Sequence, residues 1–120
     1  MILFISLVAA AGMQPAADWR PLTDNEQVRM SWDGASPHRR GDTTIVLVKL
    51  EPRPLRTGAN SYAISQVELR CARNEARIAL TENFSSDGTA GTRDEGVLPF
   101  SAIPSESFLE RLRNLVCRPA

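Results

Sequence analysis

The amino-acid sequence predicts an α+β fold, in which an antiparallel β-sheet packs against a C-terminal α-helix and one disulfide joins the two. Three observations support this class. Several segments alternate polar and apolar residues, the last segment repeats apolar residues at helical spacing, and the chain holds two cysteines. The 120 residues are enough for one domain. Fourteen basic and fourteen acidic residues balance, so the composition does not predict a nucleic-acid surface.

Residues 1–17 have the pattern of a secretory signal peptide. An apolar run over residues 2–8 precedes three alanines and is far shorter than the ~20 apolar residues that span a bilayer. We expect cleavage between Ala11 and Ala17, leaving a domain over residues 18–120 in the periplasm or outside the cell. No Lys or Arg precedes the run, which a start codon further upstream would explain; the alternative is a buried N-terminal strand or helix. The segment has no cysteine, so we expect no lipid anchor in the outer membrane.

Two strands are predicted in the first half of the chain. Residues 27–32 alternate polar and apolar side chains, which puts three apolar ones on one face: Val28, Met30 and Trp32. Residues 43–50 are apolar on both faces and rich in β-branched side chains, which predicts a central strand. Segments 33–42 and 53–61 contain Gly and Pro and are expected to be loops.

A hairpin is predicted over residues 67–80, with Asn74-Glu75 as a two-residue turn. This register places Cys71 opposite Ile78 and Leu69 opposite Leu80, and it gathers the apolar side chains on one face. Cys71 would then point into the core. A polar loop is expected to follow over residues 85–96, and residues 97–100 are expected to form a short edge strand.

The C-terminal segment, residues 103–117, is predicted to form an amphipathic helix. Ser107 and Glu110 have the spacing of a capping box, although Ser105 is an equally good N-cap. The apolar side chains of one stripe would pack on the sheet: Phe108, Leu109, Leu112, Leu115 and Val116.

The two cysteines are expected to form a disulfide. In an oxidising compartment two cysteines within one chain can pair in only one way, which joins Cys71 to Cys117. Closing a loop of that length stabilises the fold by about 4 kcal/mol in the chain-entropy model.

Motifs for catalysis or metal binding are sparse. The one histidine, His38, lies in a loop beside two arginines and is expected to be solvated; Asp33 and Ser36 are near it in sequence, but a catalytic triad requires converging geometry. We therefore expect no enzyme, no cofactor and no metal site. Arg40-Gly41-Asp42 is the tripeptide that integrins recognise, but Gly41 is also expected simply to form the turn before the strand at residue 43. The candidate binding loop comprises Arg39, Arg40, Gly41 and Asp42.

The order of these features resembles the surface-adhesin protein E-like family of Gram-negative bacteria. The shared features begin with an N-terminal export signal, Trp19, a turn with Arg39 and Gly41, and Tyr62. They continue with the pair Cys71-Ala72, the residues Ile103-Pro104 and Ser107 before the C-terminal helix, and Val116-Cys117 at its end. The resemblance covers nearly the whole mature chain. It implies a small α+β domain with the two cysteines bonded, and adhesion to host or matrix proteins.

Two hypotheses for function follow. The first is an exported, non-enzymatic binding domain with a protein partner, resembling surface-adhesin protein E and binding host, matrix or envelope proteins. The second is a periplasmic protein of another kind: a small enzyme or small-ligand carrier with its site in the loops at residues 33–42 and 85–96, or an inhibitor of another protein. Under either hypothesis the processed chain lacks a membrane span and is a monomer or homodimer.

Overall fold

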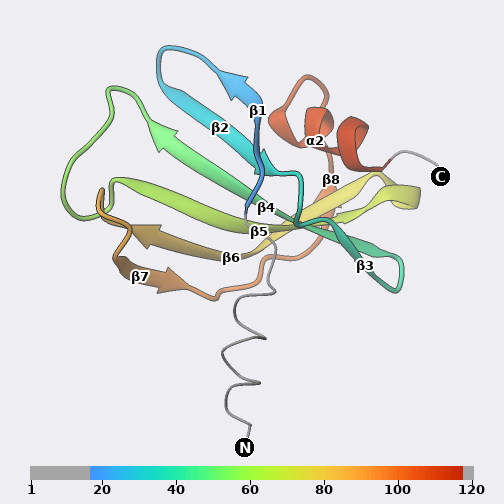
Figure 1. Ribbon diagram of the computed structural model, residues 1–120. Coiled ribbons are helices and arrows are strands. Elements are labelled where there is room, and N and C mark those ends of the chain that lie inside the picture. The colour runs from blue at the N-terminus through green and yellow to red at the C-terminus, as the bar shows by residue number, and fades with distance from the viewer. Residues whose placement is uncertain (1–16, 118–120) are drawn as a thin grey trace, which may run out of the picture.

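The computed structural model describes residues 17–117, so the expected signal peptide lies outside the described residues apart from Ala17. This part of the chain forms eight strands and one α-helix (Figure 1). The strands are β1 Trp19–Asp24, β2 Val28–Asp33, β3 His38–Arg40, β4 Thr43–Pro52, β5 Tyr62–Arg70, β6 Glu75–Phe84, β7 Ala90–Asp94 and β8 Ser101–Ala102. The helix is α2, Phe108–Val116. A mostly antiparallel sheet with one C-terminal helix and a Cys71–Cys117 disulfide matches the predicted class.

The strands form one antiparallel sheet in the order β1-β2-β4-β5-β6-β7. The short strand β3 also pairs with β4, and β8 pairs with β6. The central place of β4 confirms the interpretation of residues 43–50. Val46 and Val48 are buried on one face of β4, while on the other face Ile45 is buried and Leu47 is only partly buried.

The strand β2 follows the predicted alternation, since Met30 and Trp32 are buried on the core face. The strands β1 and β3 were not predicted. Three of the six β1 residues and all three β3 residues are exposed, so neither has a clear apolar alternation. Segment 33–42 is therefore not one loop, because β3 occupies its middle.

The connection between β5 and β6 differs from the predicted two-residue turn. Residues Cys71–Arg73 form a 3-10 helix, and Asn74 adopts a left-handed backbone with a φ of 55° before β6 begins. Asn adopts this conformation more readily than most residues. The predicted turn at Asn74-Glu75 is wrong, because Cys71 leaves the strand and Glu75 belongs to it.

The register of this hairpin is shifted accordingly. Leu69 lies opposite Ala76, where Leu80 was expected. Cys71 was expected opposite Ile78 and lies instead in the 3-10 helix. Because this shift is by an even number of residues, Leu69 and Ile78 remain on the core face. A β-bulge at Ala79 then places Leu80 opposite Gln66, on the other face, so the prediction that Leu80 faces the core is wrong.

Two expectations for residues 85–100 are also corrected. Residues 90–94 lie within the expected polar loop and form β7, which pairs with β6 although all five residues are exposed. The expected edge strand at residues 97–100 is absent; pairing begins at Ser101 in β8. An edge strand exposed on both faces has no apolar alternation by which it could be recognised in the sequence.

The helix is shorter than the predicted segment 103–117: it begins after Ser107, which is the N-cap instead of Ser105, and ends at Val116. The Ser107 hydroxyl accepts a hydrogen bond from the amide of Glu110 at 3.2 Å, and the Glu110 carboxylate accepts one from the amide of Glu106 at 3.0 Å. Leu112 is fully buried, and Phe108 is partly buried. Leu115, predicted to be part of the stripe, is 36% exposed.

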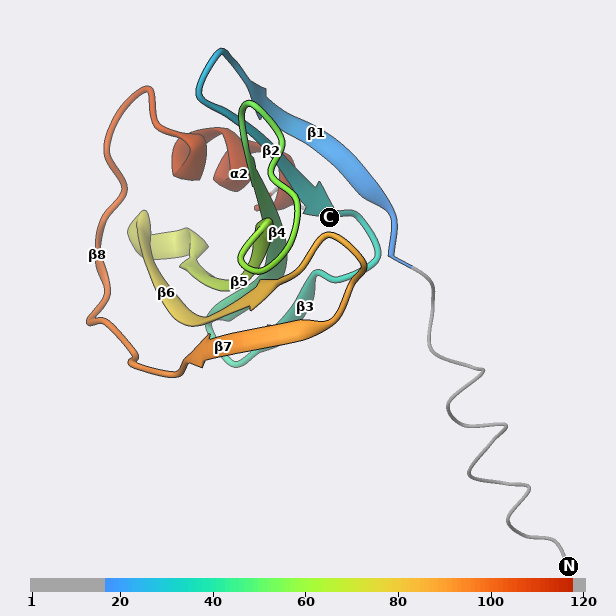
Figure 2. The ribbon, with the colours of Figure 1, turned by 90° about the vertical axis from the view of Figure 1, so that its left-hand side faces the viewer.

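The core contains side chains from the sheet and from the C-terminal segment. Buried residues of one cluster are Leu22, Met30, Trp32, Val46, Val48, Val67, Leu69, Ala76, Ile103 and Leu112. The two cysteines are partly buried against the same cluster. The sheet curves, and α2 lies on the side of its hollow (Figure 2). The disulfide therefore joins the β5–β6 connection to the C-terminal end of α2.

Replacing either cysteine by serine should lower the free energy of unfolding by roughly 2–5 kcal/mol, because the link spans 46 residues. Urea unfolding of Cys71→Ser, Cys117→Ser and the double variant would measure this change. The three variants should resemble one another, since each lacks the same bond. Two titratable thiols in protein taken directly from its native compartment would contradict the account.

Candidate functional site

The candidate binding loop forms the turn between β3 and β4. Arg40 lies opposite Thr43, so Gly41 and Asp42 are the two central residues of a tight hairpin. Gly41 has a φ of 65°, in the left-handed region where a side chain is unfavourable. The predicted turn at Gly41 is confirmed.

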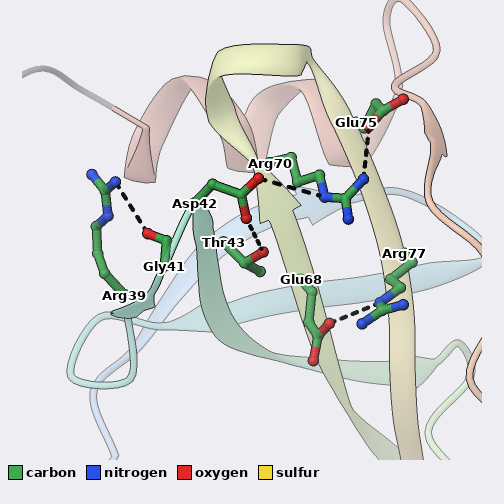
Figure 3. Close-up of polar contacts among 8 residues, drawn as sticks. All are labelled: Arg39, Gly41, Asp42, Thr43, Glu68, Arg70, Glu75 and Arg77. Carbon is green, nitrogen blue, oxygen red and sulfur yellow. Dashed lines mark hydrogen bonds and ion pairs between the residues drawn. The ribbon is translucent and has the colours of Figure 1, made fainter.

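The Asp42 side chain contacts residues of β4 and β5 and so connects this turn to the sheet. Its carboxylate accepts a hydrogen bond from the Thr43 hydroxyl at 3.1 Å and lies 3.9 Å from Nε of Arg70 on β5 (Figure 3). Both contacts direct the carboxylate towards the sheet. The aspartate of the Arg40-Gly41-Asp42 tripeptide is therefore engaged within the fold.

The arginines of the turn are arranged differently. All three residues of β3 are exposed. Arg39 makes one long contact, from Nη2 to the carbonyl oxygen of Gly41 at 3.5 Å. The Arg40 side chain has no hydrogen bond or ion pair to any residue between 17 and 117. The turn thus presents two guanidinium groups whose donors are largely unoccupied.

A cluster beside the turn was not anticipated from the sequence. We call it the arginine–phenylalanine cluster; its members are Glu68, Arg70, Glu75, Arg77 and Phe100. The guanidinium carbons of Arg70 and Arg77 lie 3.8 Å and 4.2 Å from the centre of the Phe100 ring, within cation–π range. Glu68 is buried, and its carboxylate lies 2.8 Å from Nε of Arg77. Phe100 is distant in sequence from the strands it contacts, so no local pattern could reveal the cluster.

This cluster connects three parts of the chain. Arg70 contacts Asp42 on the β3–β4 turn, Glu75 at 3.4 Å at the start of β6, and Phe100 ahead of β8. Three carboxylates face two guanidinium groups, since Asp42 adds to Glu68 and Glu75. The cluster therefore carries no excess positive charge for an anionic ligand, and we assign it a positioning role.

Asp33, Ser36 and His38 do not converge as a triad. The Ser36 hydroxyl donates to the carbonyl oxygen of Asp33 at 2.7 Å and accepts from the amide of Leu47 at 2.9 Å. Asp33 accepts hydrogen bonds from the amides of Asp18 and Ala35. These contacts satisfy backbone groups where β4 passes from its pairing with β2 to its pairing with β3. His38 is exposed, as expected.

An open depression lies where β3 meets the end of α2. It has a volume of about 410 Å³, and its lining includes His38, Arg39, Thr44, Val116 and both bonded cysteines. The predicted binding loop and the predicted disulfide are thus brought together at one end of the sheet, although they are distant in sequence.

The second candidate loop, residues 85–96, is largely a structural hairpin. The Ser85 amide donates to the carbonyl oxygen of Thr89 at 2.9 Å, and Gly88 donates back to Ser85 at 2.9 Å. The Asp87 carboxylate accepts hydrogen bonds from the Ser85 hydroxyl and the Thr89 amide. Its polar groups close the β6–β7 turn instead of facing a ligand.

Among residues 17–117, no group of three His, Cys, Asp or Glu side chains could hold a metal ion. No helix in this described range is long and apolar enough to cross a membrane. No protein-family model matches the chain, and neither curated proteins nor solved structures give a match. The resemblance to surface-adhesin protein E therefore stays a prediction.

The Asp87 carboxylate should titrate at unusually low pH. Hydrogen bonds from the Ser85 hydroxyl and from Thr89 lower the pKa of Asp87 from 3.8 to about 2. Because the folded pKa is depressed, the stabilisation is complete above the unfolded value and is lost as pH falls through the folded pKa.

An NMR titration of the Asp87 carboxyl carbon would measure this pKa. Ser85→Ala should raise it, because that variant removes the hydroxyl donor. Ser86→Ala is the matched control, since the Ser86 hydroxyl accepts from Gly58 instead. A wild-type midpoint at the ordinary aspartate value would show that the turn does not form in this way.

Proposed function

We propose that the protein is an exported, non-enzymatic binding domain, similar to surface-adhesin protein E, which binds another protein through the β3–β4 turn. The observation that carries this proposal is the pair of exposed arginines, Arg39 and Arg40, on a turn that Asp42 and Arg70 anchor to the sheet.

Export is supported by the disulfide, because such bonds persist mainly in oxidising compartments. It is also supported by the apolar N-terminal run, which is followed by three alanines as in the cleavage region of a signal peptide. In this proposal the disulfide keeps α2 packed on the sheet after export, where a short helix alone would be marginal. The compartment is the periplasm or the extracellular space.

The chemistry of the turn favours a partner with exposed carboxylates. Guanidinium groups bind carboxylates through paired hydrogen bonds, and the donors of Arg40 are free for this within the described chain. A hairpin already fixed by Gly41 and Asp42 loses little conformational freedom on binding. The acidic side chains of a partner protein would meet these requirements.

A carrier of small molecules is less well supported. Sites for small ligands usually enclose most of the ligand surface. The depressions described on this protein are open to solvent, including those of about 410 Å³ beside the disulfide and about 540 Å³ beside Ile45 and Gln66. Protein binding to a surface turn requires no such enclosure.

Replacing both Arg39 and Arg40 by alanine should weaken partner binding by at least tenfold, while the folding stability should be nearly unchanged. Binding of the oxidised mature chain would be measured against purified extracellular-matrix proteins and against envelope proteins of its own host. Arg56→Ala is the matched control, because Arg56 is also exposed but lies in the 53–61 connection.

Raising the salt concentration should weaken binding of the wild type, because exposed charges are screened over about 8–10 Å at physiological ionic strength. The absence of saturable binding to both sources would contradict the proposal. An equal loss with Arg56→Ala would show that the turn is not the binding surface.

A further inference from the structure

A row of stacked side chains crosses the face of the sheet that lies opposite α2. The Lys49 ammonium on β4 lies 4.7 Å from the centre of the Trp19 ring on β1 and 5.7 Å from that of the Tyr62 ring on β5. Tyr62 stacks in turn on Phe84 of β6, with ring centres 5.2 Å apart. Lys49 is therefore held between two aromatic rings, in a cation–π arrangement that spans the sheet.

An open depression of about 310 Å³ adjoins this row. In the strand register, Ser31 of β2 lies directly between Pro21 on β1 and Lys49 on β4. Ser31 alternates with Met30 and Trp32, which are buried in the core that α2 covers, so Ser31 faces the opposite side. Because the Ser31 side chain is small, it leaves a hollow between the larger side chains around it.

The charged side chains around this depression are paired, except for Lys49. Arg29 donates to the two carboxylate oxygens of Glu51 at 2.9 Å and 3.1 Å, and Asp24 lies 2.7 Å from Arg53. The Lys49 ammonium has no hydrogen bond or ion pair to any residue between 17 and 117. Three cations and two carboxylates therefore leave one uncompensated positive charge, at Lys49.

Two hydrogen-bond donors lie beside Lys49. The indole N–H of Trp19 and the hydroxyl of Tyr62 have no hydrogen bond within the described chain, and both residues are only partly buried. The Pro21 ring is exposed and lines the depression together with Trp19. This surface thus combines a cation, two unoccupied donors and the apolar carbon atoms of two rings.

We propose that this depression, which we call the Lys49 site, binds an acidic saccharide, one pyranose ring of which bears a carboxylate. The carboxylate would accept charge-assisted hydrogen bonds from Lys49. The C–H face of the sugar would lie against Trp19 and Pro21, which bury apolar surface. The Ser31 hydroxyl on the floor of the site would hydrogen-bond to a sugar hydroxyl.

The charge and shape of the Lys49 site select this ligand. A neutral sugar would cover the Lys49 ammonium without pairing its charge, which costs free energy. A nucleic acid would need several cations along its backbone, and here Asp24 and Glu51 would repel its phosphates. Because the depression is open, it can hold one ring of a longer saccharide whose other rings stay in solvent.

The ring stack also prepares the site for binding. Lys49 is a flexible side chain whose ordering normally costs conformational entropy. Its position between Trp19 and Tyr62 restrains it before the ligand arrives, so less entropy is lost on binding.

The proposal goes beyond the function proposed above and does not depend on it. The β3–β4 turn presents two arginines to a partner protein, whereas the Lys49 site presents one cation between rings to a sugar. Arg39 and Arg40 do not line the depression. Variants of the two surfaces can therefore fail independently.

The test uses the oxidised mature chain and three tetrasaccharides in calorimetry. A hyaluronan tetrasaccharide represents animal matrix, a galacturonic acid tetrasaccharide represents plant walls and bacterial envelopes, and chitotetraose is the neutral control. At least one acidic tetrasaccharide should bind saturably, and chitotetraose should bind about tenfold more weakly or not at all. The preferred acidic tetrasaccharide identifies the source of the ligand.

Lys49→Gln should weaken this binding about tenfold or more without loss of thermal stability, because the Lys49 ammonium has no polar partner in the fold. Lys49→Arg should retain most of the affinity, since it keeps the charge. Arg93→Gln is the matched control, because Arg93 is an exposed cation on β7 that lies 3.0 Å from Glu95, outside the depression.

Chemical labelling gives a second measurement on the unmodified protein. Lys49 is the only lysine of the chain, so acylation of its amine can be followed by mass spectrometry of one peptide. The bound acidic tetrasaccharide should slow this acylation, and chitotetraose at the same concentration should not.

Four results would overturn the proposal. These are no saturable binding of either acidic tetrasaccharide, equal affinity for chitotetraose, an equal loss with Arg93→Gln, and acylation of Lys49 that the bound ligand does not slow. Binding that Lys49→Gln leaves intact but that the Arg39 and Arg40 alanine variant abolishes would also overturn it, because the sugar would then lie on the β3–β4 turn.

Discussion

The Cys71–Cys117 bond is the constraint on which the arrangement of this small domain depends. The helix α2 has nine residues, fewer than an isolated helix needs to be stable in water. The packing of Leu112 on the sheet and the attachments at the two ends of α2 must together hold it in place. The β5–β6 connection provides two attachments: Cys71 bonds the end of the helix, and the carbonyl oxygen of Asn74 accepts a hydrogen bond from Ile103 ahead of it. A four-residue connection thus fixes the C-terminal segment on both sides of the helix.

The same end of the molecule positions the β3–β4 turn. Arg70, the last residue of β5, contacts Asp42 of the β3–β4 turn and also the ring of Phe100. One side chain therefore contacts both the arginine-bearing turn and the segment ahead of β8. The Nε atom of Arg70 is buried without a hydrogen bond, and its carboxylate contacts are long, so this support is mainly packing against Phe100 and longer-range charge.

Much of this architecture could be predicted from local sequence. The strand at residues 43–50, the helix cap at Ser107, the turn at Gly41 and the disulfide each depend on a few neighbouring residues or on a cysteine count.

The features that the sequence did not predict share a physical cause: they depend on residues that are far apart in the chain. The strands β1, β3 and β7 lie at the edges of the sheet. Most of their side chains are exposed, so polar and apolar residues do not alternate along them. The hairpin register was wrong because the longer connection with the left-handed Asn74 and the bulge at Ala79 have no local signal in the apolar pattern. The arginine–phenylalanine cluster arises from contacts between segments that are distant in sequence, for which a single sequence contains no local signal.

Hydrogen exchange of the oxidised and the reduced protein is the most direct test of the central constraint. The account predicts that the amides of α2 exchange slowly in the oxidised protein. After reduction they should exchange much faster, while those of β4 and β5 remain protected, because the helix would open locally without unfolding of the sheet. Equal protection of α2 in the two forms would contradict the account, since the packing of Leu112 alone would then hold the helix.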